Sequence, residues 1–190
     1  DSSENILDKW ILSLLNSLVM DVTKDLDNFD TTSSIAKIGK FIDEFSTWYI
    51  RRSRDRVGPS VGNDSDKNAF YSTSYEALIT LSKVIAPLAP FVVEEIYKNL
   101  TGEESVHLTR WPEAKETDED LINSMAGIRG IVERVHSIRK ERGIKVRQPL
   151  SRMGLFGYPE GEKEKYKLFK NLLKDELNIK NVEYLEYADI

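Results

Sequence analysis

Apolar residues recur every three or four positions in five segments of the first 145 residues of this 190-residue chain. This interval places the apolar side chains on one face of a helix. Polar, glycine- or proline-containing stretches separate the segments and predict where each helix ends. Because amphipathic helices bury their apolar faces against one another, we predict a helical bundle. The five predicted helices span about residues 6–29, 35–57, 69–86, 90–101 and 118–142.

The last 45 residues follow a different pattern. After Gly143, residues 151–158 and 182–187 are predicted to be strands, with turn residues at 159–161 and a short helix over residues 163–177 between them. We therefore predict a mainly α fold with two domains. Residues 1–145 form the helical bundle, and residues 146–190 form a small β-α-β appendage.

Composition excludes several kinds of site. The chain contains no cysteine, which rules out disulfides and thiolate-bound metals, and its two histidines are far apart in sequence, so we expect no metal site. We find no apolar run near the about 18–20 residues of a membrane span, and no secretory signal. We therefore expect a cytoplasmic chain with no membrane contact. It begins with Asp1 rather than Met, so we expect either an excised piece of a longer protein or a processed N-terminus.

The formal net charge of −5 conceals an uneven distribution. Residues 101–126 carry seven acidic and two basic side chains, whereas residues 127–152 carry eight basic and two acidic ones. A third segment, residues 51–56, holds four arginines and one aspartate. Because charges act mainly within a Debye length of about 8 Å, basic patches can bind a polyanion despite a negative total.

The first basic patch follows two aromatic residues. Arg52 and Arg56 are four positions apart and share a helical face with Trp48. A guanidinium binds phosphate in a bidentate manner, and an aromatic ring can stack on a base. We favour a core position for the aromatic residues, but Trp48 stays a candidate. The arginines fit phosphate binding and ion pairs with neighbouring helices equally well. The candidates here are Trp48, Arg51, Arg52, Arg54 and Arg56.

The second basic patch closes the fifth predicted helix and continues beyond it. The helix dipole favours cations in the last turn of a helix. It does not account for Lys145 and Arg147, which lie beyond Gly143, so an anionic partner is indicated. The candidates here are Arg139, Lys140, Arg142, Lys145 and Arg147.

The residues give no sign of catalysis. The sequence lacks a glycine-rich phosphate loop, a metal-spaced cluster and a nucleophile motif, so we predict no catalytic residue. A binding module is the better interpretation. The alternative is a helical protein-interaction or structural module without RNA binding, whose basic patches meet the acidic segment 103–120 of another copy or domain.

Five strings, in order, carry a family resemblance. Together they resemble the anticodon-binding region of class I isoleucyl-tRNA synthetases, over roughly residues 5–155. The strings WYIRRSRDR and KVRQPL are the most specific, and APLAPF occurs more widely in the class. The strings are residues 8–13 (DKWILS), 48–56 (WYIRRSRDR), 86–91 (APLAPF), 105–112 (SVHLTRWP) and 145–150 (KVRQPL).

The resemblance implies both a partner and a parent enzyme. It implies a helical bundle that docks on the anticodon stem-loop of isoleucine tRNA, with the ten candidates above on the tRNA-facing or inter-domain side. The parent would ligate isoleucine to its tRNA with ATP and Mg in catalytic and editing domains outside this chain. Both catalytic signature strings of the class are missing here. We therefore expect a monomeric chain that needs no cofactor and is inactive alone.

Overall fold

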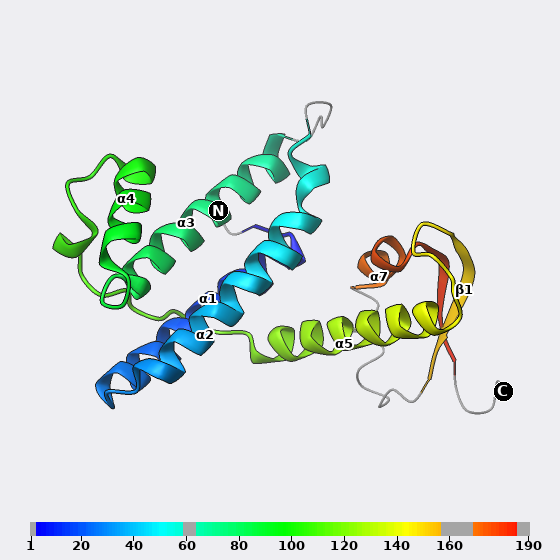
Figure 1. Ribbon diagram of the computed structural model, residues 1–190. Helices are drawn as coiled ribbons and strands as arrows, with labels where there is room; N and C mark the ends of the chain where they lie inside the picture. The colour runs from blue at the N-terminus through cyan, green and yellow to red at the C-terminus, as the bar shows by residue number, and fades with distance from the viewer. Residues whose placement is uncertain (1–2, 59–63, 157–168, 186–190) are drawn as a thin grey trace. The chain divides into compact units, whose positions relative to one another are not determined.

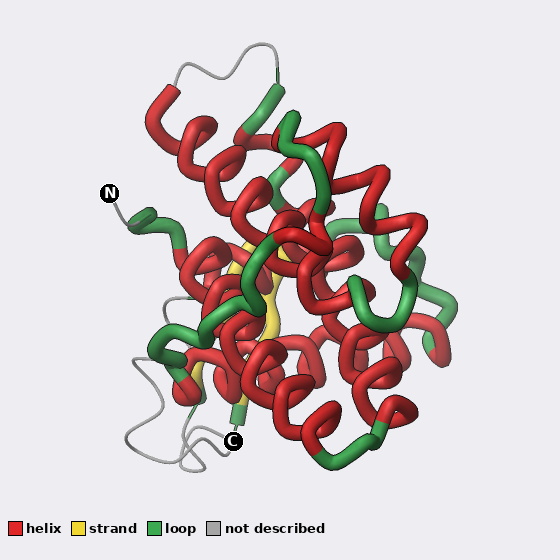
Figure 2. Tube along the Cα trace, turned by 90° about the vertical axis from the view of Figure 1, so that its left-hand side faces the viewer, coloured by secondary structure: helices red, strands yellow, loops and turns green. Residues whose placement is uncertain are grey.

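The computed structural model describes residues 3–58, 64–156 and 169–185 and confirms the mainly α fold (Figure 1). The chain packs as two compact units, Asp1–Glu119 (unit 1) and Asp120–Ile190 (unit 2). In the tube view, strands form only a small part of the described chain (Figure 2). Unit 1 holds α1 (Ile6–Asp27), α2 (Thr31–Glu44), the π-helix η1 (Phe45–Ile50), the 3₁₀ turn η2 (Arg54–Arg56), α3 (Asp64–Ile85), α4 (Pro90–Thr101) and η3 (Val106–Leu108).

Capping residues begin the first two helices. The side chain of Asn5 accepts a hydrogen bond from the Leu7 amide, and that of Asp30 accepts one from the Ser33 amide. Each cap satisfies an amide that has no partner inside the helix. The two helices lie side by side (Figure 1), and an ion pair of 2.7 Å joins Lys37 of α2 to Asp25 of α1. They form the first layer of the unit 1 core.

A stacked row of aromatic rings joins α2, η1 and α3. Phe41, Phe45, Tyr49 and Phe70 stack in succession, with centroids 6.1, 5.5 and 5.6 Å apart. All four rings are buried. Stacked aromatic pairs add stability beyond the area that they bury. The row thus holds the end of the second predicted helix against α3.

Phe29, Ile35 and Ile42 belong to the three- and four-residue apolar pattern of the first two predicted helices, which predicts them in the core, but they are exposed. Phe29 is 93% exposed, and Ile35 and Ile42 also face solvent. Phe29 follows the end of α1 with a φ of 59°, so it lies in the turn rather than on the helix. The buried face of α2 instead follows Ser34, Ile38 and Phe41, and Ile35 and Ile42 lie outside it. The wider π-helical turn at η1, further along the chain, keeps Tyr49 on the face of Phe41.

The bounds of α4 agree with those of the fourth predicted helix. Pro90 occupies the first turn, and Gly102 ends the helix with a φ of 73°, a conformation that suits glycine. The carboxylate of Glu94 accepts hydrogen bonds from the Ser105 hydroxyl at 3.0 Å and the Val106 amide at 2.9 Å. These bonds hold η3 against α4.

Unit 2 contains a β-α-β arrangement. It holds α5 (Glu119–Glu141, whose first residue belongs to unit 1), β1 (Leu150–Leu155), α7 (Lys170–Leu177) and β2 (Ile179–Tyr184). The strands pair in parallel, with Leu150 opposite Ile179 and Met153 opposite Val182. The β-α-β prediction is confirmed for these residues. The predicted turn at 159–161 and the first part of the predicted helix lie outside the described residues.

The division between the units differs from the predicted domain boundary. Packing separates the chain after Glu119, whereas the change of sequence pattern lies at residues 145–146. The end of α5 hydrogen-bonds to the segment that follows it, which groups this helix with the strands. Folding of residues 1–145 as one domain stays a prediction.

Candidate nucleic-acid interface

The first candidate patch is a turn between η1 and α3. Residues 51–56, here called the arginine turn, run from the end of η1 through the 3₁₀ turn η2. Arg51 and Arg54 are exposed, whereas Arg52 and Arg56 are partly buried. Ser53 is buried, and its amide donates to the Tyr49 carbonyl at 3.0 Å. The four arginines of the turn therefore differ in how far their side chains are exposed to solvent.

Arg56 is held by two carboxylates. Its two terminal nitrogens donate to the carboxylate of Asp8 at 2.6 and 2.7 Å, and it also bonds Asp66 at 2.7 and 2.9 Å. The Arg56 side chain is 10% exposed, and that of Asp8 is fully buried. Its guanidinium carbon lies 5.6 Å from the centroid of the Phe70 ring. This geometry argues against the predicted phosphate contact for Arg56, because its N–H donors already bind protein groups.

The surroundings of Asp8 shift its ionisation. Burial alone raises the pKa of this carboxyl group, but hydrogen bonds from Arg56, Ser3 and Tyr49 outweigh burial and hold the pKa below its usual value. The Tyr49 hydroxyl donates at 2.8 Å and the Ser3 hydroxyl at 2.6 Å. The folded state thus stabilises the ionised form of Asp8.

The effect of removing the Asp8 charge should depend on pH. The folded chain keeps this carboxyl ionised to a lower pH than the unfolded chain does. Its contribution to the free energy of unfolding is therefore complete above the unfolded pKa of about 3.9 and is lost as the pH falls through the lower folded value. We expect Asp8→Asn to destabilise the chain at neutral pH and progressively less as the pH falls below the unfolded pKa and through the lower folded one. Urea unfolding of both proteins at neutral pH and at a pH below the unfolded pKa tests this.

The exposed Asp43 offers a matched control. Asp43→Asn removes the same charge from α2 without touching the Asp8 cluster, so it should change stability little at either pH. An equal gap between Asp8→Asn and the unchanged chain at both pH values contradicts the expectation.

Trp48 and Arg51 form an aromatic–cation pair at the surface. The guanidinium carbon of Arg51 lies 5.9 Å from the centroid of the Trp48 ring, and the Arg51 Nε donates to the Thr47 carbonyl at 2.7 Å. Trp48 is half-buried rather than part of the core, whereas its neighbour Tyr49 is fully buried. The structure thus supports the core interpretation for Tyr49 alone.

The second candidate patch surrounds the end of α5. Arg139 is only 2% exposed, and its guanidinium donates to backbone carbonyls of unit 2. This position argues against the predicted phosphate contact for Arg139. Four other candidates are exposed and are here called the basic strip: Lys140, Arg142, Lys145 and Arg147.

Comparison with known proteins identifies the family. Residues 8–153 match the family model described as the anticodon-binding domain of tRNA ligase. The chain belongs to this family. The matched segment includes both the arginine turn and the basic strip of this anticodon-binding domain.

Relatives agree with the resemblance drawn from the sequence. The domain is 42% identical to the isoleucine–tRNA ligase of Clostridium novyi (strain NT), covering 96% of the chain and 18% of that relative. It is 41% identical to the enzyme of Leifsonia xyli subsp. xyli (95% and 16%) and 40% identical to that of Chlamydia trachomatis serovar D (94% and 18%). These matches confirm the resemblance, and the chain spans less than a fifth of each relative.

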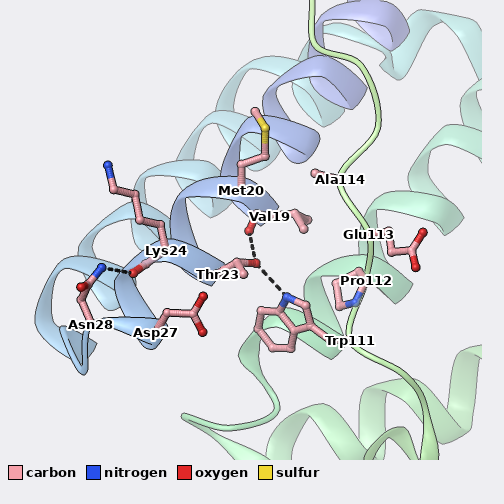
Figure 3. Close-up of a pocket in the computed structure, with 10 residues that line it drawn as sticks. All are labelled: Val19, Met20, Thr23, Lys24, Asp27, Asn28, Trp111, Pro112, Glu113 and Ala114. Carbon is pink, nitrogen blue, oxygen red and sulfur yellow. Dashed lines mark hydrogen bonds between the residues drawn. The ribbon is translucent and has the colours of Figure 1, made fainter.

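The anticodon-binding domain also has a groove that sequence reasoning missed. It lies between the second half of α1 and the segment 111–114, and its volume is about 560 Å³ (Figure 3). The Trp111 indole N–H donates to the Thr23 hydroxyl at 2.8 Å, and this hydroxyl donates to the Val19 carbonyl at 2.6 Å. Lys24, Asp27 and Glu113 contribute charges of both signs to the lining. The only sequence signal was the Trp-Pro pair, used solely for the resemblance.

The described part of the domain shows no group of metal-ligating side chains and no membrane-spanning helix. Among residues 3–58, 64–156 and 169–185, no three His, Asp or Glu side chains are grouped to hold a metal ion. None of the helices described there is long and apolar enough to cross a bilayer. The candidate binding groups that lie at the surface are the exposed cations and the pair of Trp48 with Arg51.

Proposed function

We propose that this domain binds the anticodon stem-loop of isoleucine tRNA as part of an isoleucine–tRNA ligase. The observation that carries the proposal is the basic strip, four exposed cations inside the segment that matches the anticodon-binding family. The relatives supply the amino acid, because those compared above are named isoleucine–tRNA ligases. Phosphate contacts provide affinity and register, whereas unpaired loop bases provide specificity.

The two patches have different proposed tasks. The basic strip contacts phosphates, since its cations lie at the end of a helix and in the segment beyond it. At the arginine turn, Trp48 with Arg51 is suited to stack on an unpaired base, and Arg54 to contact a phosphate. Arg52 faces the tRNA or a neighbouring domain of the ligase. Arg56 and Arg139 stabilise the two patches by binding protein groups, Arg56 at the arginine turn and Arg139 next to the basic strip.

The remaining steps of aminoacylation are proposed for parts of the enzyme outside this chain. The chain spans 16–18% of its relatives, which leaves room for separate catalytic and editing domains. Those domains would ligate isoleucine to its tRNA with ATP and Mg in the cytoplasm. We propose that the present chain is monomeric and inactive alone. Isoleucine-dependent exchange of pyrophosphate into ATP by the purified chain would contradict this.

Neutralising two cations of the basic strip should weaken tRNA binding in a salt-dependent manner. We expect Lys145→Ala with Arg147→Ala to lower the affinity for isoleucine tRNA. The plot of log K against log salt should flatten by about 0.7–0.9 for each phosphate that the variant no longer neutralises. Titration of tRNA at several salt concentrations measures both quantities.

A matched double variant controls for net charge. Lys40→Ala with Lys98→Ala also removes two exposed cations, on α2 and α4, and should leave the salt slope nearly unchanged. Equal slopes for the unchanged chain and both double variants would place the tRNA contact elsewhere. A chain that binds a tRNA for another amino acid equally well would contradict the proposed specificity.

One observation favours the alternative of a protein-interaction module. Phe91, Val92 and Leu108 are exposed on α4 and η3, with Phe91 90% exposed. Exposed apolar side chains that gather in a patch mark protein contacts. If the alternative holds, light scattering should show self-association that rises with concentration, and tRNA should not bind.

A further inference from the structure

The side chain of Arg139 ties together three backbone segments of unit 2. From the last turn of α5, its Nη1 donates to the carbonyls of Lys145 and Gln148, at 3.1 and 3.0 Å. Its Nη2 donates to the carbonyl of Leu177, the last residue of α7, at 2.7 Å. A carbonyl at the end of a helix lacks a partner within the helix, and a cation stabilises it. Arg139 therefore donates to three backbone carbonyls, and its bond to Leu177 at the end of α7 is buried.

Asn178 also binds the backbone of the segment 145–149, here called the loop. It follows α7 with φ 49° and ψ 55°, a left-handed conformation that asparagine tolerates. Its side-chain amide donates to the Val146 carbonyl at 3.1 Å, and its own carbonyl accepts from the Leu150 amide at 3.0 Å. Two residues from different elements thus bind the loop, Arg139 from α5 and Asn178 from the start of the β2 segment.

The loop adds hydrogen bonds of its own. The Ile144 amide donates to the Arg139 carbonyl at 2.8 Å, and the Gln148 amide donates to the Lys145 carbonyl at 2.9 Å. The carbonyls of residues 145, 146 and 148 therefore all accept hydrogen bonds. The side chains of residues 145–149 are nevertheless all exposed. The backbone is held while every side chain of this segment stays available.

We propose that residues 145–149 form a preorganised RNA-contact loop, in which Lys145 and Arg147 bind phosphates and Arg139 and Asn178 act as positioning residues. This inference rests on the proposed function, because it takes the ligand to be tRNA. A mobile loop must be ordered when it binds, and that loss of conformational entropy weakens binding. A loop already held by its carbonyls avoids most of this loss.

Asn178→Gly is the most direct test. Glycine adopts the left-handed conformation readily, so the backbone is kept while the bond to the Val146 carbonyl is removed. The change leaves the net charge unaltered. We expect the affinity for isoleucine tRNA to fall about two- to tenfold, the change equivalent to one hydrogen bond. The salt slope should stay the same, because the phosphate contacts still form once the loop is ordered.

Further variants separate the positioning of the loop from its contact with phosphates. Lys145→Ala removes a phosphate contact, so it should flatten the salt slope by about 0.7–0.9. Asn181→Gly removes an exposed asparagine from β2, outside the loop, and should change neither affinity nor slope. Hydrogen exchange of the Gln148 and Leu150 amides reports loop order independently of binding, and it should be faster in Asn178→Gly but not in Lys145→Ala or Asn181→Gly. Arg139→Lys, which keeps the charge with fewer donors, should give a smaller loss of affinity than Arg139→Met.

The outcomes distinguish this inference from the proposed function. If Asn178→Gly speeds amide exchange but binds tRNA as well as the unchanged chain, loop order does not matter and the inference is wrong. If the unchanged chain binds tRNA but Lys145→Ala and Arg147→Ala leave the slope intact, the loop is not the contact and only the inference fails. If the unchanged chain does not bind tRNA, both fail. Should Arg139→Met not fold, Asn178→Gly still decides the question.

Discussion

Replacing Arg56 by alanine is expected to lower the free energy of unfolding of unit 1 by about 3–5 kcal/mol, the range for breaking one side of a buried ion pair. The loss is large because Arg56→Ala leaves the Asp8 carboxylate buried without its bidentate partner. It also removes the Arg56–Asp66 ion pair, although the hydrogen bond from Asn5 still joins the start of α1 to Asp66. Urea unfolding followed by circular dichroism measures the change.

The neighbouring Arg54 supplies the matched control. It lies in the same turn and carries the same charge, but its side chain is exposed. Arg54→Ala should therefore change stability by less than about 0.5 kcal/mol. Similar losses in the two variants would show that the Asp8–Arg56–Asp66 cluster contributes little to stability.

The same two variants separate support from tRNA contact. At a temperature where Arg56→Ala is still folded, its salt slope for tRNA binding should match that of the unchanged chain. Arg54→Ala should flatten the slope, because Arg54 is the exposed arginine proposed for a phosphate. The reverse result would restore the contact that the sequence predicted for Arg56.

Local chemistry made several elements predictable from sequence. Pro90 and Gly102 mark the two ends of α4, because each residue favours one backbone geometry wherever it occurs. The alternation of patterns after Gly143 was enough to predict a β-α-β appendage. Helix existence and order were likewise predictable, since the three- and four-residue interval is repeated many times in each helix.

The wrong predictions concern side chains whose exposure depends on contacts distant in sequence or on an irregular turn. Ile35 and Ile42 were misplaced because the buried face of α2 follows Ser34, Ile38 and Phe41, and the three- and four-residue interval alone does not define the edges of that face. The sequence left ion pairing and phosphate binding equally open for Arg56 and favoured an anionic partner for Arg139, because the groups that bind them are remote in sequence, 48 positions away at Asp8 and 38 at Leu177. Charge density located both patches but did not distinguish an arginine that binds protein from one that faces solvent.

Truncating Met125 in α5 should test which part of the chain this helix stabilises. Met125 is fully buried, and removing a buried Met, Leu or Ile side chain typically costs about 2–5 kcal/mol. Because α5 groups with the strands, we expect Met125→Ala to speed amide hydrogen exchange in β1, α7 and β2. Exchange in α1 and α3 should hardly change. Segment-resolved hydrogen exchange followed by mass spectrometry measures this directly.

Ile11→Ala is the matched variant in unit 1, since Ile11 is also fully buried and its replacement removes a side chain of similar size. It should speed exchange in α1, α2 and α3 and leave β1 and β2 nearly unchanged. If Met125→Ala instead loosens α1 and α3 while the strands stay protected, α5 belongs energetically with the bundle. That result would support the boundary predicted at residues 145–146 over the division after Glu119. Either way, the two exchange maps show whether the basic strip is stabilised by the same unit as the arginine turn.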